Sequence, residues 1–267
     1  MKTSHLISER FWEPFRLRNQ EARGFALGPL RIWVRRDGDD LLGLVFRDGD
    51  LKSAVCEPEL EGEAPEVGQW RRLGSASASP TVKLLPAMPN RPVVVRPEVP
   101  YTILPSEKVQ FYVGVPLWIH LKSDKDVLLL EEPVMRLSNT WFGSPMEGEL
   151  AYAMRTMAKR QVQDLDFHPW RAVCPVRIKN QTKDKLTFER ICLRVQYLDL
   201  YQDPVGGIWT NDSGVTVRGD DNNWSRISYA RGAPDELKSP RLLVNAREEV
   251  KGGFSLKALR GAGGMFQ

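Results

Sequence analysis

Histidine and cysteine are the side chains from which a metal centre or a covalent site would be built. The chain has three histidines and three cysteines, and they are His5, His120, His168, Cys56, Cys174 and Cys192. None of them occurs at the HExxH or CxxC spacing that places two ligands on one metal ion. The sequence therefore predicts no metal site.

Cys174 is the cysteine that lies nearest to other reactive side chains in the sequence. It precedes Pro175 in an apolar strand, where a cysteine is usually a small core residue. A reactive thiol would need an electropositive, partly exposed pocket, and only His168 and Arg177 are near enough in sequence to supply one. We therefore predict a core role for Cys174.

Other catalytic patterns are absent from the sequence. There is no GxxxxGK[ST] loop for phosphate, no GxGxxG after a strand and no GxSxG elbow. Glu131-Glu132 and the pair Glu147 and Glu149 would suit a hydrolase only if two carboxyl groups faced each other across a cleft. Asp220 to Asn223 offers oxygen ligands without the EF-hand spacing, so we predict a turn. We predict no catalytic residue and no cofactor.

Aromatic residues carry more information, because eight tryptophans occur in 267 residues. Trp118 is predicted to lie beside Tyr112 and His120, on the strand face opposite an apolar face. Such a face forms either a core between two units or a platform for a ligand or partner, and the sequence leaves both open. The candidate binding residues are Tyr112, Trp118, His120, Trp141, Glu149, Tyr152 and His168.

Short apolar runs must position these residues. Nineteen prolines and 21 glycines separate the runs, a pattern typical of β-sandwiches or barrels. In Val109 to Leu121 every odd position is apolar, which is the period of a half-buried strand. Pro116 cannot donate to a ladder, so it predicts an edge, a bulge or a break into two strands. We predict a mainly β protein with two β-sandwich-like units and at most one or two short helices.

Two hairpins are predicted from turn signals between apolar runs. In the first, the strands Phe25 to Arg36 and Leu41 to Arg47 flank Asp37 to Asp40, which contains an Asp-Gly turn signal. The second runs from Ala172 to Tyr197 around a polar turn at Asn180 to Asp184. Each hairpin would place two sequential strands side by side in one sheet.

The return strand of the second hairpin changes the parity of its apolar residues at Glu189-Arg190. One extra residue there, a β-bulge, would restore a continuous apolar face. Cys192 would then lie on the face away from Cys174. The pattern therefore argues against a disulfide between these two cysteines.

Residues 145–162 fit two templates. Ser144 to Glu147 matches a capping box with a proline at the first helical position, and the apolar residues that follow also match helical spacing. Leu150, Tyr152 and Met154 alternate as in a strand. We predict a strand, because the surrounding segments are predicted hairpins.

Composition divides the chain into three parts. Glu57 to Pro92 is acidic, rich in proline and poor in hydrophobic periodicity, which is typical of a loop-rich connection. We predict an N-terminal β unit with this connection over residues 1–85, a C-terminal β-sandwich unit over 93–245 and a tail over 246–267. The glycine-rich end, Gly252 to Gln267, is either a frayed tail or a short partner-binding segment.

The charge balance favours no single class of partner. There are 38 basic and 34 acidic side chains, for a net charge of +4. The most basic window, Arg155 to Tyr197, is interpreted as the solvated face of a sheet, with nucleic-acid binding as the alternative. The residues that would bind nucleic acid are Arg171, Arg177, Lys179, Lys183, Lys185, Arg190 and Arg194.

Three features of the sequence bear on the compartment. No stretch of 18 apolar residues could form a membrane-spanning helix, and residues 1–19 contain no apolar core of a signal peptide. An odd number of cysteines indicates free thiols. We therefore expect a cytoplasmic protein without membrane insertion.

Several strings of residues together resemble a known family. They are Pro86-Ala87-Met88-Pro89-Asn90-Arg91-Pro92 followed by Val93-Val94-Val95-Arg96-Pro97, Ile103-Leu104-Pro105, Phe111-Tyr112-Val113, Val115-Pro116-Leu117, Leu137-Ser138, Trp141-Phe142-Gly143, Gly148-Glu149-Leu150-Ala151-Tyr152, and Cys174-Pro175-Val176 with Ile178 and Asn180. The chain resembles, from about residue 10 to residue 245, the prokaryotic family catalogued as domain of unknown function 432. The resemblance implies no established activity and no catalytic residue.

The absence of catalytic motifs favours a binding role. We expect a non-enzymatic accessory or structural module that presents a sheet face or edge to another protein, or to a second copy in a homo-oligomer. The alternative is a small-ligand-binding protein or an enzyme with a site in the cleft between the two β units. Its candidate residues are His120, Glu149, Tyr152 and His168, which can titrate or form hydrogen bonds.

Overall fold

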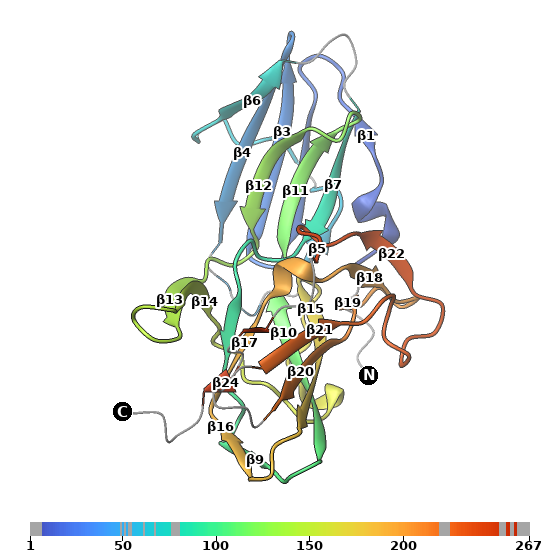
Figure 1. Cartoon of the computed structure of the whole chain (residues 1–267). Helices are drawn as coiled ribbons and strands as arrows, with labels where there is room; N and C mark the ends of the chain where they lie inside the picture. Colours follow the sequence, from blue (N-terminus) through green and yellow to red (C-terminus); the bar gives the residue numbers. More distant parts are fainter. Residues whose placement is uncertain are drawn as a thin grey trace.

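The protein is an elongated stack of two β-sandwiches, one above the other (Figure 1). The structure is a computed structural model that describes residues 7–48, 50, 52, 55–60, 62–66, 68–75, 81–218, 225–250, 255–256 and 259–260. Helix among these residues is limited to three short 3-10 segments, η1 (Glu9–Trp12), η2 (Val162–Asp164) and η3 (Val195–Tyr197). The prediction of a mainly β protein is confirmed.

The upper sandwich consists of two sheets in the described part of the chain. One has the order β1-β7-β11-β12 and contains β1 (Phe15–Arg16), β7 (Thr81–Ala87), β11 (Trp118–Ser123) and β12 (Leu128–Pro133). The other has the order β5-β2-β3-β4-β6 and contains β2 (Ala22–Leu27), β3 (Leu30–Asp37), β4 (Asp40–Arg47), β5 (Cys56–Glu57) and β6 (Arg71–Ser75). Alternate side chains of each strand point inward, and Phe25, Ile32, Leu84 and Ile119 are buried there.

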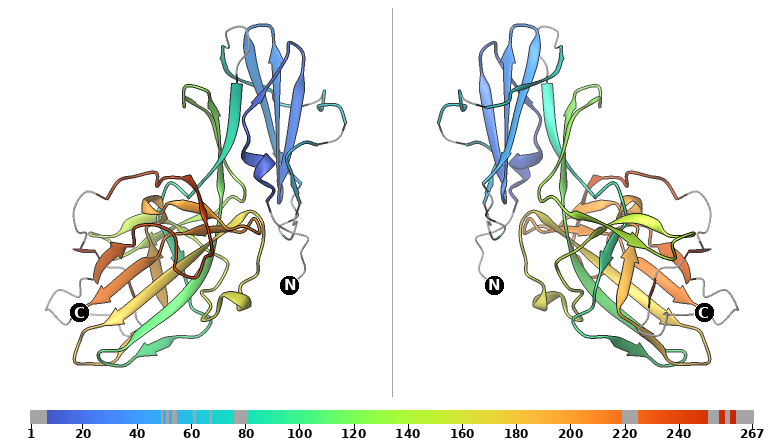
Figure 2. Two further views of the ribbon diagram at one scale, coloured as in Figure 1. Left: turned by 90° about the vertical axis from the view of Figure 1, so that its right-hand side faces the viewer. Right: turned by 90° about the vertical axis from the view of Figure 1, so that its left-hand side faces the viewer.

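The lower sandwich contains the largest sheet (Figure 2). Its order is β22-β18-β19-β15-β20-β21-β23, with β10 also paired to β15. Its strands are β10 (Lys108–Pro116), β15 (Arg171–Asn180), β18 (Leu200–Gln202), β19 (Ile208–Thr210), β20 (Ser213–Val217), β21 (Ser225–Tyr229), β22 (Arg241–Val244) and β23 (Ser255–Leu256). Phe111, Val113 and Val176 from this sheet belong to the same buried cluster as the core of the upper sandwich.

Two smaller sheets complete the lower sandwich. One has the order β13-β14-β8-β17-β24, and the other is the pair β16-β9. Their strands are β8 (Val93–Val95), β9 (Tyr101–Ile103), β13 (Ser138–Phe142), β14 (Glu149–Ala153), β16 (Leu186–Phe188), β17 (Arg190–Leu193) and β24 (Leu259–Arg260). Val93, Val95, Ile191 and Leu193 join the main core, so this layer covers the large sheet through its apolar face.

The alternating run from Val109 to Leu121 joins the two sandwiches. All of its odd-numbered side chains are buried, as predicted. The run breaks after Pro116, so that β10 belongs to the lower sandwich and β11 to the upper one. Leu117, at the break, donates its backbone N–H to Trp170 and accepts one from Val134, both at 2.9 Å. Of the three alternatives that Pro116 left open, the structure shows the break into two strands, and the break is where the chain crosses between the sandwiches.

Trp170 fills the space under the upper sandwich. Its side chain is fully buried, and it lies directly against Gly28, where a Cβ atom would clash with the indole. Gly28 has a φ of +55°, in the left-handed region that glycine adopts without strain. The turn between β2 and β3 can therefore approach the indole closely only because residue 28 is a glycine.

The first predicted hairpin is correct at Asp37 to Asp40 but wrong in its first strand. Phe25 to Arg36 is not one strand, because β2 and β3 form a separate hairpin around Gly28 and Pro29. The turn was not predicted because the residues on both sides of it are apolar and buried, so the sequence reads as one continuous strand. The turn between β3 and β4 consists of Gly38 and Asp39 only, with Asp37 paired to Asp40.

The second predicted hairpin, Ala172 to Tyr197, is wrong. β15 pairs with β10, β19 and β20, whereas β16 pairs with β9 and β17 pairs with β8. The buried amide of Asn180 donates to the backbone carbonyls of Ile103 and Asp184, at 3.0 and 2.8 Å. This contact ties the polar turn to the end of β9, so the chain leaves β15 instead of folding back on it.

The change of parity at Glu189-Arg190 is an interruption between β16 and β17. Phe188 and Ile191 are both buried in the main core on either side of it. Cys192 lies on the opposite face, in a small cluster that is separate from the one containing Cys174. Both cysteines are free thiols, so the prediction that they form no disulfide is confirmed.

The strand pairing crosses the predicted border between residues 1–85 and 93–245. β11 and β12 come from the second segment but pair with β7 and with each other in the upper sandwich. Glu57 to Pro92 is also less loop-like than predicted, because it contains β6 and the whole of β7. β7 was missed because its apolar alternation, from Val82 to Leu84, is short.

Within the ambiguous segment 145–162, Glu149–Ala153 is a strand, as predicted, but residues 145–147 form a turn and Val162 begins a 3-10 segment. β14 pairs with β13 in register, with Trp141 opposite Leu150. The Ser144 hydroxyl does accept the backbone N–H of Glu147, at 3.1 Å, but a tight turn follows instead of a helix. In the predicted tail, β23 and β24 pair with β21 and β17. The remaining residues of 251–267, and Asp220 to Asn223, lie outside the described residues.

Candidate functional site

The junction between the two sandwiches brings side chains of the β11–β12 hairpin together with an arginine from the C-terminal segment. His120 on β11 forms a hydrogen bond to Glu131 on β12, with 3.0 Å between Nε2 and Oε1. Arg247, which follows β22, forms an ion pair with the same carboxylate oxygen. The Arg247 Nε also donates to the backbone carbonyl of Met88, at the end of β7. One arginine thus connects the C-terminal segment to two strands of the upper sandwich.

Burial and pairing set the charge states of this network. Burial lowers the pKa of His120, because a cation loses hydration in the protein interior. The hydrogen bond to Glu131 acts in the opposite direction, and the nearby Arg247 adds to the lowering. Burial alone would raise the pKa of Glu131, but hydrogen bonds from His120 and Arg247 outweigh it and the net shift is downward. The network therefore holds a neutral imidazole beside an ion pair.

Trp118 and Tyr152 extend the junction toward the lower sandwich. Their ring centroids are 6.3 Å apart, and the Arg247 guanidinium lies 5.3 Å from the Trp118 ring, within the range of a cation–π contact. The Tyr152 hydroxyl donates to Asn90 at 2.9 Å. Trp118 therefore contacts Arg247 on one side and Tyr152 on the other, and His120 shares the Glu131 carboxylate with Arg247.

Arg247 was missed because the sequence places it in the predicted tail. No motif surrounds it, and its partners Glu131 and Met88 are more than one hundred residues away. Its side chain is nevertheless only 17% exposed. Arg247 of the C-terminal segment thus lies against the face of β11 that carries Trp118 and His120.

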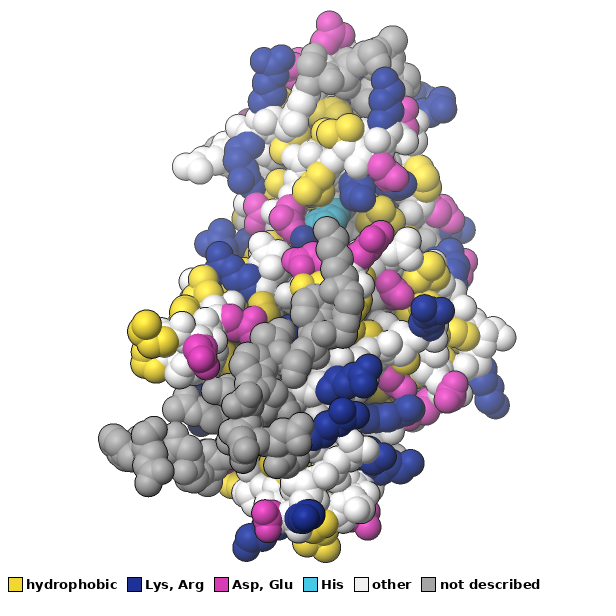
Figure 3. Space-filling view, in the orientation of Figure 1, with side chains coloured by type: hydrophobic (Ala, Val, Ile, Leu, Met, Phe, Trp, Pro, Cys, Tyr) yellow, Lys and Arg dark blue, Asp and Glu magenta, His cyan; other side chains and the backbone are white. Residues whose placement is uncertain are grey.

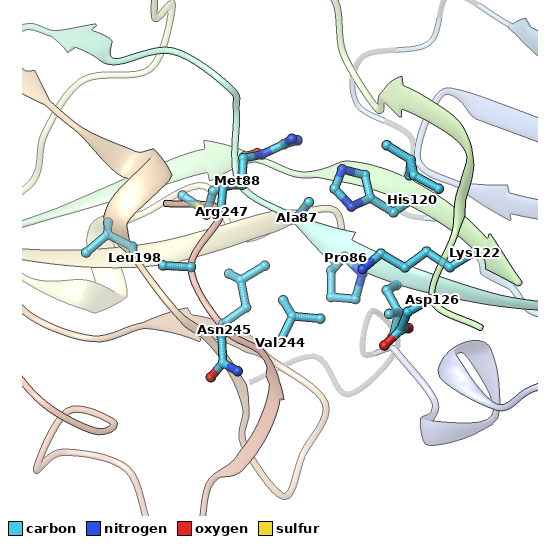
Figure 4. A pocket seen from close by; sticks show the side chains of 14 residues that line it. Pro86, Ala87, Met88, His120, Lys122, Asp126, Leu198, Val244, Asn245 and Arg247 are labelled. Atoms are coloured by element: carbon cyan, nitrogen blue, oxygen red, sulfur yellow. The ribbon is translucent and has the colours of Figure 1, made fainter. Parts of the chain in front are cut away.

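A half-open cavity of about 320 Å³ lies beside this network (Figure 4). The end of β7 and the strands β11 and β12 form one side, and the segments around β18 and β22 form the other. The lining residues are Leu85, Pro86, Ala87, Met88, His120, Lys122, Asp126, Leu128, Leu198, Leu200, Val244, Asn245, Ala246 and Arg247. The cavity combines apolar walls with a small number of charged groups, which is typical of small-ligand sites.

Trp141 lies apart from the cavity, on the hairpin formed by β13 and β14. Its side chain is 48% exposed, and its indole N–H donates to the backbone carbonyl of Ser144 at 2.9 Å. Met146 and Leu150 on the same hairpin are also exposed. In the space-filling view, hydrophobic side chains gather over the end of this hairpin (Figure 3). The hairpin therefore presents an apolar surface of its own.

The other three candidate residues do not join either site. Glu149 forms an ion pair with the buried Arg194. Tyr112 donates its hydroxyl to Glu236 at 2.7 Å, and burial, with the neighbouring Glu236 carboxylate, raises its pKa to about 12. His168 stacks on Trp170, with ring centroids 5.0 Å apart. These contacts give each residue a structural partner.

The basic residues of the nucleic-acid alternative do not share one exposed face. Arg171 and Arg194 are the most buried of them, with side chains 10% and 4% exposed. Arg171 lies 4.5 Å from the Trp170 ring centroid, and Arg177 pairs with Asp212 at 2.7 Å. Nucleic-acid binding would have to use the remaining exposed lysines, which weakens that alternative.

Two further features are absent from the described part of the chain. Within it, no three His, Cys, Asp or Glu side chains are grouped so that they could hold a metal ion. The same residues include no helix that is both long and apolar enough to span a bilayer.

The sequence model of one family matches residues 11–259, which is nearly the whole chain. The family is described as protein of unknown function (DUF432). The chain belongs to the DUF432 family. The resemblance predicted from sequence strings is thereby confirmed, and the match extends past residue 245 to include Arg247. Comparison of this DUF432 protein with curated proteins and with solved structures returned no match.

Proposed function

We propose that this DUF432 protein is a non-enzymatic β-module that binds protein through the β13–β14 hairpin. The supporting observation is the exposure of three large apolar side chains on this one hairpin. Trp141 is 48%, Met146 93% and Leu150 43% exposed. Contiguous apolar surface of this kind marks interaction sites, and Trp and Met are enriched in protein interfaces.

The outer edge of β13 gives the hairpin a second means of association. β13 is the terminal strand of its sheet, with β14 as its neighbour on the inner side. Natural edge strands are commonly protected by charged residues, proline or a bulge. Ser138–Phe142 contains no charged residue and no proline. Its backbone edge is therefore suited to the addition of a further strand.

A second copy of the chain is the partner that this edge fits best. Two identical edges can pair in antiparallel orientation about a two-fold axis, which closes the assembly as a dimer. The cross-strand pair of Trp141 and Leu150 would then lie beside its own copy, and the apolar surface would be covered. A reducing compartment such as the cytoplasm is part of the proposal, and the three free cysteines support it.

Sedimentation equilibrium of the full chain tests this proposal. We expect a dimer that dissociates when Trp141 and Met146 are both replaced by serine, because both side chains contribute apolar contact. Phe167→Ser is the matched control, since Phe167 is 49% exposed but lies outside the hairpin, and it should leave the dimer intact. A wild-type protein that stays monomeric at every concentration, or a dimer that the double variant leaves unchanged, would contradict the proposal.

A further inference from the structure

The cavity at the junction is a second site, independent of the hairpin. Its volume of about 320 Å³ lies at the lower end of the range for small-molecule sites, which is roughly 300–1,000 Å³. Met88, Leu198 and Leu200 are buried side chains in its wall, and Val244 is partly buried. These residues supply an apolar surface on the side of the lower sandwich and at the end of β7.

The charged side chains that line the cavity and are described in the structure are paired, with one exception. Asp126 forms an ion pair with Lys83 at 2.9 Å. Glu131 is held by Arg247 and His120. Lys122 forms no ion pair within the described part of the chain, and its ammonium group points across the cavity toward Pro86 (Figure 4).

The local charge balance favours an anion. Among the residues that line the cavity, Lys122 and Arg247 carry positive charges and Asp126 carries a negative charge, so one positive charge is in excess when His120 is neutral. A bound carboxylate could accept a charge-assisted hydrogen bond from the Lys122 ammonium, which is stronger than a neutral hydrogen bond. An apolar body would meanwhile cover the aliphatic wall.

We propose that the junction cavity binds a small monocarboxylate with an apolar tail, and that Lys122 binds its carboxylate. The tail lies along Met88, Leu198 and Val244. The site uses the space between the two sandwiches and residues of both. It requires no covalent step, and the hairpin β13–β14 takes no part in it.

Methyl NMR of the full chain, labelled at its seven methionines, tests the site with octanoate and 1-octanol as probes. The two probes share an apolar tail of the same length and differ in charge. Octanoate should shift the Met88 methyl signal in a saturable way. Met146, on the exposed hairpin, is an internal control for non-specific contact with the tail.

Lys122→Gln is the decisive variant, and Lys125→Gln is its control. Lys125 is exposed and does not line the cavity, so it removes the same charge from a neighbouring position. Loss of a charge-assisted hydrogen bond should weaken octanoate binding about tenfold or more in Lys122→Gln. Lys125→Gln should bind octanoate as the wild type does, and 1-octanol should bind Lys122→Gln and the wild type equally.

Three results would overturn the assignment. The first is an octanoate affinity that Lys122→Gln does not change. The second is an octanoate-dependent shift at Met146 without one at Met88. The third is an equal weakening by Lys122→Gln and Lys125→Gln, which would show that only the net charge matters. An unchanged methionine spectrum in the absence of probe confirms that each variant is folded.

Discussion

Trp170 and Trp141 show how differently two regions of this protein use the same side chain. Trp170 is fully buried at the junction, where it contacts the β2–β3 turn, the β10–β11 crossing and His168. Trp141 is half exposed, and its indole N–H donates to Ser144 of the same hairpin. The burial of Trp170 depends on segments far apart in sequence, whereas the Trp141 indole forms its hydrogen bond within one hairpin. We therefore expect substitutions at the junction to change stability and substitutions on the hairpin to change association.

Replacing Trp170 by alanine should have the largest effect on folding. A buried tryptophan replaced by alanine typically costs about 3–5 kcal/mol of unfolding free energy, since the removed indole leaves a cavity. The loss should affect both sandwiches together, because Trp170 touches elements of each. Urea denaturation followed by circular dichroism measures the change. A loss below about 1 kcal/mol, the size of an average substitution, would show that the junction is not a shared core.

Replacing Arg247 by methionine should have the next largest effect. The variant keeps much of the apolar stem over Trp118 but removes the donors to Glu131 and Met88. We expect a loss of about 1.5–3 kcal/mol, the range for hydrogen bonds to charged groups. The same urea experiment measures it, with Arg241→Met as the control, because Arg241 has a more exposed side chain. Equal losses in both variants would contradict a special role for Arg247.

The pH dependence of stability should further distinguish the junction, which contains His120 and Glu131, from the hairpin. Because burial lowers the pKa of His120 below its ordinary 6.5, the unfolded chain takes up a proton that the folded protein excludes. Stability from this group is therefore complete above about pH 6.5, and it falls as the pH drops below that value. Glu131 adds a second loss at lower pH, below its ordinary 4.5, because its folded pKa is lowered too.

Thermal unfolding measured from pH 8 to pH 5 tests this dependence. In the wild type, the midpoint temperature of unfolding should decrease as the pH drops below about 6.5, because the imidazole of the unfolded chain becomes protonated there. In His120→Gln the fall over this range should be smaller, since glutamine does not titrate. The same slope in both proteins would assign the pH dependence to other groups.

Replacing Trp141 by alanine should have the smallest effect on stability. Substitutions of exposed residues usually change the unfolding free energy by less than about 0.5 kcal/mol. Dimer association should nevertheless weaken. In this variant we therefore expect a change in the sedimentation experiment without a matching change in the unfolding free energy. If Trp141→Ala destabilised the monomer as much as Trp170→Ala, the hairpin would belong to the core and its proposed role would fail.

The sequence predicted local features of the fold well and long-range pairing poorly. The alternation in β10 and β11, the break after Pro116 and the strand at β14 all depend on neighbouring residues, and all are confirmed. The hairpin predicted after Ala172 is wrong because β15 pairs with β10, β19 and β20 and β16 pairs with β9, and the buried Asn180 amide bonds to the end of β9. The sequence does not distinguish an asparagine in a polar turn that faces water from one that bonds to another strand.

The candidate site was predicted only in part for the same reason. Trp118 and His120 share one strand face, which follows from their spacing. Tyr152 is one of the candidates, but its contact with Trp118 depends on how two sheets meet. Arg247 has no signal in the sequence, since its partners come from β12 and the end of β7.

The sequence by itself determined that this chain is mainly β and that the odd-numbered residues of the central apolar run turn inward. Those features follow from side-chain size and polarity at a period of two residues. Only the tertiary structure decided which strands pair, which tryptophan is buried and which charged groups meet at the junction. Burial between distant segments depends on the path of the whole chain, and it sets both the pairing of charges and the exposure of apolar surface.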